Sequence, residues 1–282
     1  MKFIFFGTPE FAAIILEKLI QAELMPEAVI CNPDKPTGRK QIITPPPVKV
    51  LAQKYGLTIY QPKDKNELLE IIKKLQPDLA ITAAFGMIFP KEILEIPKYG
   101  FINVHPSLLP KYRGPTPIQT AILNGDKETG VSLFLIDEEM DHGPILAKRE
   151  LEFPISNFQF PILSQKLAEL GADLLIETLP KYINGEIKPQ AQDESQATYT
   201  KKFSTQDAYI EPKDLEKAQN EGREIAVEID RKIRALNPEP GTWTILNGKR
   251  TKLLEAKIID GRLKITKIQV EGKKPQNICG VE

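Results

Sequence analysis

The stretch from Ile102 to Gln119, INVHPSLLPKYRGPTPIQ, places Asn103 and His105 two residues apart, and the chain has only two histidines in all. Apolar residues around the pair predict a strand, on which side chains two apart point to the same face. An amide can donate to a developing oxyanion, and an imidazole can exchange protons near neutral pH. The pair is therefore a candidate catalytic site. The alternative is a core histidine satisfied by the backbone, beside a capping asparagine.

Two later runs, GVSLFLID and GPILAKRELEF, predict a strand pair, and the connection EEMDHG between them contains Asp141 and His142. The stretch from Asp137 to Asp141 could therefore bring a carboxylate to this pair. A carboxylate beside an imidazole favours its charged form. No cysteine lies in this part of the chain, and Ser107 has no evident base, which favours direct transfer over a covalent intermediate. A single histidine without thiols makes a poor zinc site, so we expect no metal.

The elements that position these residues follow from the order of the apolar runs. KFIFFG, EAVICN, TIYQP, PDLAITAAFG and GFINVHP predict strands, with helical patterns between them, whereas PDKPTGRKQIITPPP predicts a loop. This alternation indicates a doubly wound, mainly parallel α/β sheet. Ligands bind beyond the carboxyl ends of such strands, so Gly7–Pro9, Phe85–Ile88 and Asn103–Ser107 should line one crevice. The turn FGTPEFA is not GxGxxG, which argues against a dinucleotide.

The last third of the chain has a different character. EIKPQAQDESQATYTKK is polar and aperiodic and predicts a linker, and a helical pattern with Ile225, Ile229, Ile233 and Leu236 follows it. Asn247–Gly248 and Asp260–Gly261 predict hairpins, for which a small barrel is the natural closure. We expect a catalytic domain over 1–188, a linker over 189–204 and a C-terminal barrel-like domain over 205–282.

Charge is distributed unevenly along the chain. Lysine plus arginine and aspartate plus glutamate both number 38, yet residues 231–282 carry 12 basic and 5 acidic side chains. Such a basic end suggests a polyanionic partner, although a solvated lysine-rich surface is the simpler alternative. The two cysteines, Cys31 and Cys279, fit a reducing cytosol, and we expect no signal peptide and no membrane span. The expected location is the cytoplasm.

The combination of NVHPSLLPKYRGPTPIQ and MDHGPIL resembles the folate-dependent formyltransferase family. Its motif is Asn-x-His, then Ser-Leu-Leu-Pro, then Arg-Gly, with a later Asp-x-Gly. GTPEFA, GRK and KIRALNPEPGTWTILNGKR extend the resemblance to about Pro275, whereas QNICGVE departs from the family's hydrophobic end. The resemblance implies a Rossmann-like formyltransferase domain followed by a small OB-like β-barrel, in a chain that we expect to be a monomer.

The resemblance also implies the substrates and the catalytic roles. The donor would be 10-formyltetrahydrofolate, and the acceptor would be the α-amino group of methionine on initiator tRNA. Asn103 and protonated His105 would stabilise the oxyanion, while Asp141 would hold His105 charged and help to carry a proton. His142 is interpreted as incidental.

The same resemblance assigns binding residues. Ser107, Leu108, Leu109 and Pro110 would contact the folate, and Phe85, Gly86, Met87 and Ile88 would form the wall of the pterin pocket. Arg39 and Lys40 lie in a loop that would reach the acceptor end of the tRNA, where Arg39 would position the methionyl amine. Lys249, Arg250 and Lys264 would contact its phosphates, and Trp243 is either a stacking platform or part of the core.

Three other functions remain to be weighed. A sugar-nucleotide N-formyltransferase would use the same donor and the same chemistry, but a small acceptor needs no basic tail. A single-domain glycinamide ribonucleotide formyltransferase is disfavoured by the chain's length. A non-catalytic tRNA-binding protein would have no use for Asn103, His105 and Asp141 together.

Overall fold

The protein is described by a computed structural model that covers residues 1–38, 40–151 and 158–278. The chain packs into two compact units. The first comprises Met1–Gly114, Thr129–Glu152 and Ser164–Tyr199, and the second comprises Pro115–Glu128, Phe153–Leu163 and Thr200–Glu282. The first unit thus extends to Tyr199, past residue 189 where the linker is expected to begin. No described helix is both long and apolar enough to cross a membrane.

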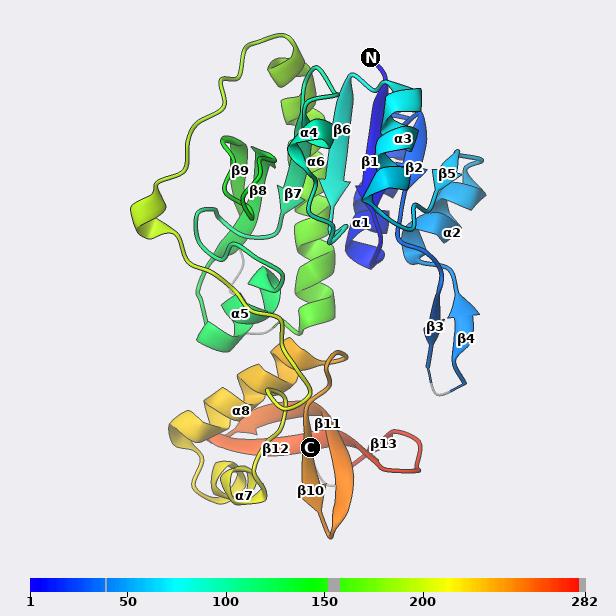
Figure 1. Cartoon of the computed structure of the whole chain (residues 1–282). Coiled ribbons are helices and arrows are strands. Elements are labelled where there is room, and N and C mark those ends of the chain that lie inside the picture. Colours follow the sequence, from blue (N-terminus) through cyan, green and yellow to red (C-terminus); the bar gives the residue numbers. More distant parts are fainter. Residues whose placement is uncertain (39, 152–157, 279–282) are drawn as a thin grey trace. The chain divides into compact units, whose positions relative to one another are not determined.

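The first unit is built on a seven-stranded sheet (Figure 1). Its strands are β1 (Phe3–Gly7), β2 (Ala28–Ile30), β5 (Ile59–Tyr60), β6 (Leu79–Ala83), β7 (Phe101–His105), β8 (Thr129–Leu135) and β9 (Ile145–Leu151). The order is β5-β2-β1-β6-β7-β8-β9, and the first five strands pair in parallel while β8 and β9 are antiparallel. The expected Rossmann-like α/β sheet and the β8–β9 pair are confirmed.

Helices connect these strands or follow the last of them, where the apolar period of the sequence changes from that of a strand to that of a helix. They are α1 (Glu10–Gln21), α2 (Pro47–Lys54), α3 (Lys65–Leu75), α4 (Lys91–Leu94) and α6 (Phe160–Ile183). The side chain of Asp64 caps α3 by accepting from the backbone N–H groups of Asn66 and Glu67. Leu68 and Ile72, one turn apart, are the buried residues of this helix. Capping and apolar spacing therefore agree on where α3 begins and which face it buries.

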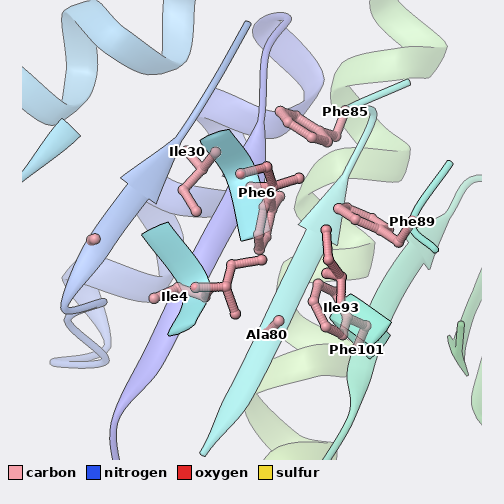
Figure 2. Close-up of a cluster of buried hydrophobic side chains, with 11 residues drawn as sticks. Ile4, Phe6, Ile30, Ala80, Phe85, Phe89, Ile93 and Phe101 are labelled. Carbon is pink, nitrogen blue, oxygen red and sulfur yellow. The ribbon is translucent and has the colours of Figure 1, made fainter. Parts of the chain in front are cut away.

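One face of the sheet carries an aromatic cluster (Figure 2), which also includes Leu68 and Ile72 of α3 and Ile93 of α4. Phe6 of β1 is fully buried, and its ring centroid lies 5.2 Å from those of Phe85 and Phe89 and 5.6 Å from that of Phe101. Phe85 and Phe89 follow the carboxyl end of β6, which leads from the core toward the predicted crevice. The cluster therefore fixes the backbone at the strand ends.

We expect Phe6→Ala to lower the free energy of unfolding by about 3–5 kcal/mol, because the substitution leaves a cavity among three aromatic rings. Chemical denaturation followed by far-UV circular dichroism measures this change. Met25→Ala is the control, because Met25 is 48% exposed. A loss below about 1 kcal/mol would show that the cluster does not support the sheet.

The segment predicted as a loop before α2 contains a short hairpin, so that prediction is wrong in part. Strand β3 (Lys35–Thr37) pairs antiparallel with β4 (Ile42–Thr44). The hydroxyl groups of Thr37 and Thr44 lie 2.6 Å apart across the pair. The proline and glycine of this segment lower its strand propensity and therefore do not predict a hairpin. Pro36 is tolerated in β3 because both strands of a two-stranded sheet are edge strands.

The second unit combines helices with an antiparallel sheet. Its elements are α5 (Pro117–Asn124), α7 (Pro212–Asn220), α8 (Arg223–Leu236), β10 (Trp243–Leu246), β11 (Lys249–Ile259), β12 (Arg262–Val270) and β13 (Gln276–Asn277). Both predicted hairpins are present, with Asn247 and Asp260 in the left-handed region of the backbone. Gly222 separates α7 from α8 with φ +72, and a Cβ there would lie 2.2 Å from the carbonyl oxygen of Gly261.

The strand order of this unit is β10-β11-β12-β13. Leu253, Leu263 and Ile265 from the sheet and Ile229 and Ile233 from α8 share one buried cluster. The structure therefore establishes an antiparallel sheet packed on a helix.

Candidate functional site

Strand β7 holds Asn103 and His105 at its carboxyl end, as expected. Asn103 lies opposite Thr82 of β6, and the hydroxyl of Thr82 donates to Asn103 Oδ1 over 2.6 Å. His105 lies opposite Ser132 of β8. Because Thr82 occupies the carbonyl oxygen of the Asn103 side chain, its Nδ2 group is the part that can donate to a substrate.

One ring nitrogen of His105 is hydrogen-bonded, and the other faces a carboxylate. Its side chain is nearly buried, and Nε2 donates to the backbone oxygen of Tyr112 over 3.0 Å, since a carbonyl oxygen can only accept. Nδ1 lies 3.6 Å from Oδ2 of Asp141. The backbone bond is the contact expected of a core histidine, and the carboxylate is the contact expected of a catalytic one. His105 makes both, so Nδ1 is the nitrogen left to act.

Asp141 reaches His105 from the connection between β8 and β9. Its backbone has φ +52, and its Oδ2 accepts from the N–H of Gly114 over 2.7 Å. Tyr112 and Gly114, which bind His105 and Asp141, belong to the loop that follows β7. The structure therefore brings Asn103, His105 and Asp141 together, with one loop touching both members of the histidine–carboxylate pair.

Arg113, between those two residues, is fully buried, a role that the Arg-Gly of the motif did not reveal. Its guanidinium donates to Oε1 of Gln192, to the carboxylate of Glu194 and to the hydroxyl of Tyr199. The hydrogen bond to Glu194 raises the pKa of Arg113 and lowers that of Glu194. The only sequence signal is a basic residue beside glycine, in a stretch that contains a second basic residue, Lys111.

His142, interpreted as incidental, has its own partners and is not part of the pair formed by His105 and Asp141. Its Nδ1 lies 2.6 Å from Oδ2 of Asp137, and its Nε2 lies 3.5 Å from Oε1 of Glu194. The hydrogen bond with Asp137 raises the pKa of His142. Because it is about one-third exposed, His142 serves as a control for His105.

The expected folate residues after β7 occupy different environments. Ser107 and Leu109 are buried, and the hydroxyl of Ser107 donates to the backbone oxygen of Lys111. Leu108 lines a hollow of about 420 Å³ together with Lys148, Arg149 and Glu150. The Leu109–Pro110 peptide bond is cis. Within this run, Leu108 and Pro110 are the residues with accessible side chains.

The expected pterin wall after β6 is divided between core and surface. Phe85 is 5% exposed and packs in the aromatic cluster, against which Met87 also packs, while Ile88 is 65% exposed. Gly86 has φ +77. Asn32 Nδ2 donates to the backbone oxygen of Phe85 and ties this loop to the end of β2.

The expected tRNA residues lie on two surfaces. Lys40 is exposed beside the hairpin of β3 and β4, and Arg39 lies outside the described residues. Lys249, Arg250 and Lys264 are exposed on the sheet of the second unit. Trp243 packs against Tyr209, donates to the backbone oxygen of Thr205 and lies under the Arg250 guanidinium, which favours the packing interpretation. In the described part of the chain, no group of three or more His, Cys, Asp or Glu side chains is placed to hold a metal.

Comparison with known proteins agrees with this geometry. Residues 1–179 match the formyl transferase family, and residues 223–262 match the formyl transferase C-terminal domain. A methionyl-tRNA formyltransferase from Kosmotoga olearia is 43% identical, over 97% of this chain and 93% of the relative.

Two solved structures share the fold. The methionyl-tRNA formyltransferase from Clostridium thermocellum has a TM-score of 0.62 at 20% identity, over 96% of this chain and 98% of that one. HypX from Aquifex aeolicus in complex with tetrahydrofolic acid has a TM-score of 0.67 at 18% identity, and this chain spans 46% of its length. With the matched domains and the near full-length relative, this chain belongs to the methionyl-tRNA formyltransferases, a family of formyl transferases.

Proposed function

We propose that the protein transfers the formyl group of 10-formyltetrahydrofolate to the α-amino group of methionyl initiator tRNA, in the cytoplasm and as a monomer. The observation that carries this proposal is the convergence of Asn103, His105 and Asp141 at the end of β7, in a chain of this family. An amide donor, an imidazole and a carboxylate can together stabilise an oxyanion and move a proton, which acyl transfer to an amine needs.

The proposed reaction is a direct transfer between two nitrogens. The amine nitrogen attacks the formyl carbon, a carbon–nitrogen bond forms, and the carbonyl electron pair moves onto oxygen. Collapse of this intermediate breaks the bond from the formyl carbon to the folate nitrogen. The proton lost by the amine ends on that leaving nitrogen, so the products are formylmethionyl-tRNA and tetrahydrofolate.

Asn103 and His105 are assigned to the oxyanion. Thr82 fixes the Asn103 amide, so Nδ2 can donate without reorganising when charge develops. Nε2 of His105 is already committed to Tyr112, and therefore the imidazole contributes through a proton on Nδ1. Asp141, 3.6 Å from that nitrogen, accepts the amine's proton, directly or through water.

The folate is proposed to lie along the loops that follow β6 and β7. Leu108, Pro110 and Ile88 offer accessible side chains, whereas Phe85, Ser107 and Leu109 support the loop backbones from within. Met87 packs beneath the same loop, and Gly86 permits its turn. The tetrahydrofolate held by HypX, which shares this fold, supports a folate site in this architecture.

The tRNA is proposed to contact Arg39 and Lys40, which lie between β3 and β4 in the sequence, and the basic sheet carrying Lys249, Arg250 and Lys264. Lys264 lies directly opposite Lys257 on the neighbouring strand, and both are exposed. Like charges placed opposite each other destabilise a sheet unless an anion bridges them, and a phosphate would do so. Residues 205–282 are proposed to complete a small OB-like barrel, a fold that binds nucleic acids.

We expect Lys264→Ala to weaken binding of initiator and elongator tRNA about equally. The slope of log affinity against log salt concentration should shrink by about one unit, because one phosphate contact is lost. Fluorescence anisotropy at several salt concentrations measures both quantities. Lys65→Ala, an exposed lysine of α3, is the control. An unchanged salt slope for Lys264→Ala would remove that residue from the interface.

The molecule that accepts the formyl group distinguishes the proposed function from that of a sugar-nucleotide N-formyltransferase. Purified protein supplied with the formyl donor should formylate methionyl initiator tRNA and leave a nucleotide-linked amino sugar unmodified, as mass spectrometry of the products would show. Formylation of the sugar nucleotide in preference to the tRNA would instead support the sugar N-formyltransferase alternative.

A further inference from the structure

Residues 192–199 carry no predicted site, yet their side chains reach the loops that hold the proposed catalytic pair. Gln192 is half-buried, and its amide bonds in two directions. Oε1 accepts from Nε and Nη2 of Arg113 over 3.1 and 2.9 Å. Nε2 donates to the backbone oxygens of Asp141 and Gly143, over 2.8 Å in both cases.

The orientation of this amide is dictated by its partners. A guanidinium can only donate and a carbonyl oxygen can only accept, so Oε1 must face Arg113 and Nε2 must face the loop of Asp141. Glutamine thus satisfies both sides at once. Glutamate would accept from Arg113 equally well, but it would place a negative oxygen against two carbonyl oxygens.

Arg113 connects this amide to the other side of the site. The backbone N–H of Arg113 donates to the backbone oxygen of Thr198, and the backbone N–H of Tyr112 donates to the Thr198 hydroxyl. Tyr112 accepts from His105, and Gly114 donates to Asp141. A shift of Arg113 would therefore also move its neighbours Tyr112 and Gly114, which bind His105 and Asp141.

Burial requires that Arg113 be bound in this way. A guanidinium with no exposure needs charge or hydrogen-bond partners, and Gln192, Glu194 and Tyr199 supply them. Glu194 and Tyr199 are largely exposed, and Glu194 approaches the loop of Asp141 only through the side chain of His142, 3.5 Å away. Among the described side chains that bind Arg113, Gln192 is the one that also bonds to the backbone of Asp141.

We propose that Gln192 is a positioning residue, which holds the Asp141 loop against the Arg113 loop so that the carboxylate faces Nδ1 of His105. This inference rests on the proposed function, because it assigns to Gln192 an effect that is exerted through Asp141. A misplacement of about 1 Å can cost about a hundredfold in turnover.

The test is a double-mutant cycle with Gln192→Glu, which keeps the Arg113 bond and removes the donor to the loop. We expect kcat for formyl transfer to fall about tenfold or more, with KM for both substrates within about threefold of wild type. In an Asp141→Asn background the same substitution should change kcat by less than about twofold, since the group it positions is already disabled. Gln196→Glu, which adds the same charge in the same segment, should keep wild-type kcat.

Each outcome supports or overturns the inference. A fall in kcat of the same factor in both backgrounds would show that Gln192 acts on the fold and not through Asp141. Wild-type kcat in Gln192→Glu alone would also overturn it, while leaving the proposed function intact if Asp141→Asn is slow. If Asp141→Asn itself has wild-type kcat, both the role of Asp141 and the role of Gln192 fail together.

Discussion

Replacing His105 with alanine, or Asp141 with asparagine, lowers kcat for formyl transfer by about a hundredfold or more while the protein remains folded. His105→Ala removes the nitrogen that faces the carboxylate, and Asp141→Asn removes the charge 3.6 Å from it. Loss of one oxyanion donor costs about 10²–10³ in turnover, and loss of a general acid or base costs a comparable factor. Steady-state kinetics with both substrates saturating measures kcat directly.

The chain supplies matched controls for both substitutions. His142→Ala removes the other histidine, and Asp137→Asn removes its partner carboxylate in the same connection between β8 and β9. Both variants should retain kcat within a few-fold of wild type. If His105→Ala were no slower than His142→Ala, the end of β7 would not be the catalytic site.

Gly143→Ala is expected to lower kcat about a hundredfold, although residue 143 touches no substrate in the proposed mechanism. A Cβ at this position would lie 1.8 Å from the backbone oxygen of Leu135 and 3.0 Å from its carbonyl carbon. Both atoms are backbone of β8, so the loop must move instead of the strand. Asp141 is two residues away, and a shift of about 1 Å is enough to misplace its carboxylate.

Measuring kcat together with the melting temperature separates this effect from general unfolding. Gly185→Ala is the control, because a Cβ there meets nothing within 4 Å and its φ of +76 adds only local strain. Both variants should remain folded at the assay temperature, whereas kcat should fall in Gly143→Ala alone. Wild-type kcat in Gly143→Ala would mean that the loop tolerates displacement without consequence for Asp141.

The parallel sheet and the placement of Asn103 and His105 could be predicted because both follow from local periodicity. Apolar strands alternate with helical patterns, and the period of a strand puts residues 103 and 105 on the same face. The location of the candidate site at the carboxyl end of β7 then follows, because ligands bind beyond the carboxyl ends of the strands in open sheets. The hairpins at Asn247 and Asp260 follow in the same way from two-residue turn signals.

The supports of the site could not be predicted, because they join distant parts of the chain through side chains. Gln192 is 51 residues from Asp141 and 79 from Arg113, and its segment has no apolar period. Asp141, with its left-handed backbone, likewise contacts Gly114 and Gln192, which lie far from it in the sequence. The hairpin of β3 and β4 was missed because proline and glycine lower strand propensity.

The most direct measurement is the single-turnover rate of transfer of a labelled formyl carbon from 10-formyltetrahydrofolate to methionyl initiator tRNA, in wild type and in His105→Ala. Excess enzyme removes product release from the rate, so the chemical step is observed alone. The account predicts rapid labelling of the methionine amine by wild type and labelling slower by about a hundredfold in the variant, with unchanged binding of both substrates. Equal rates in the two proteins, or no labelling of the tRNA by wild type, would contradict it.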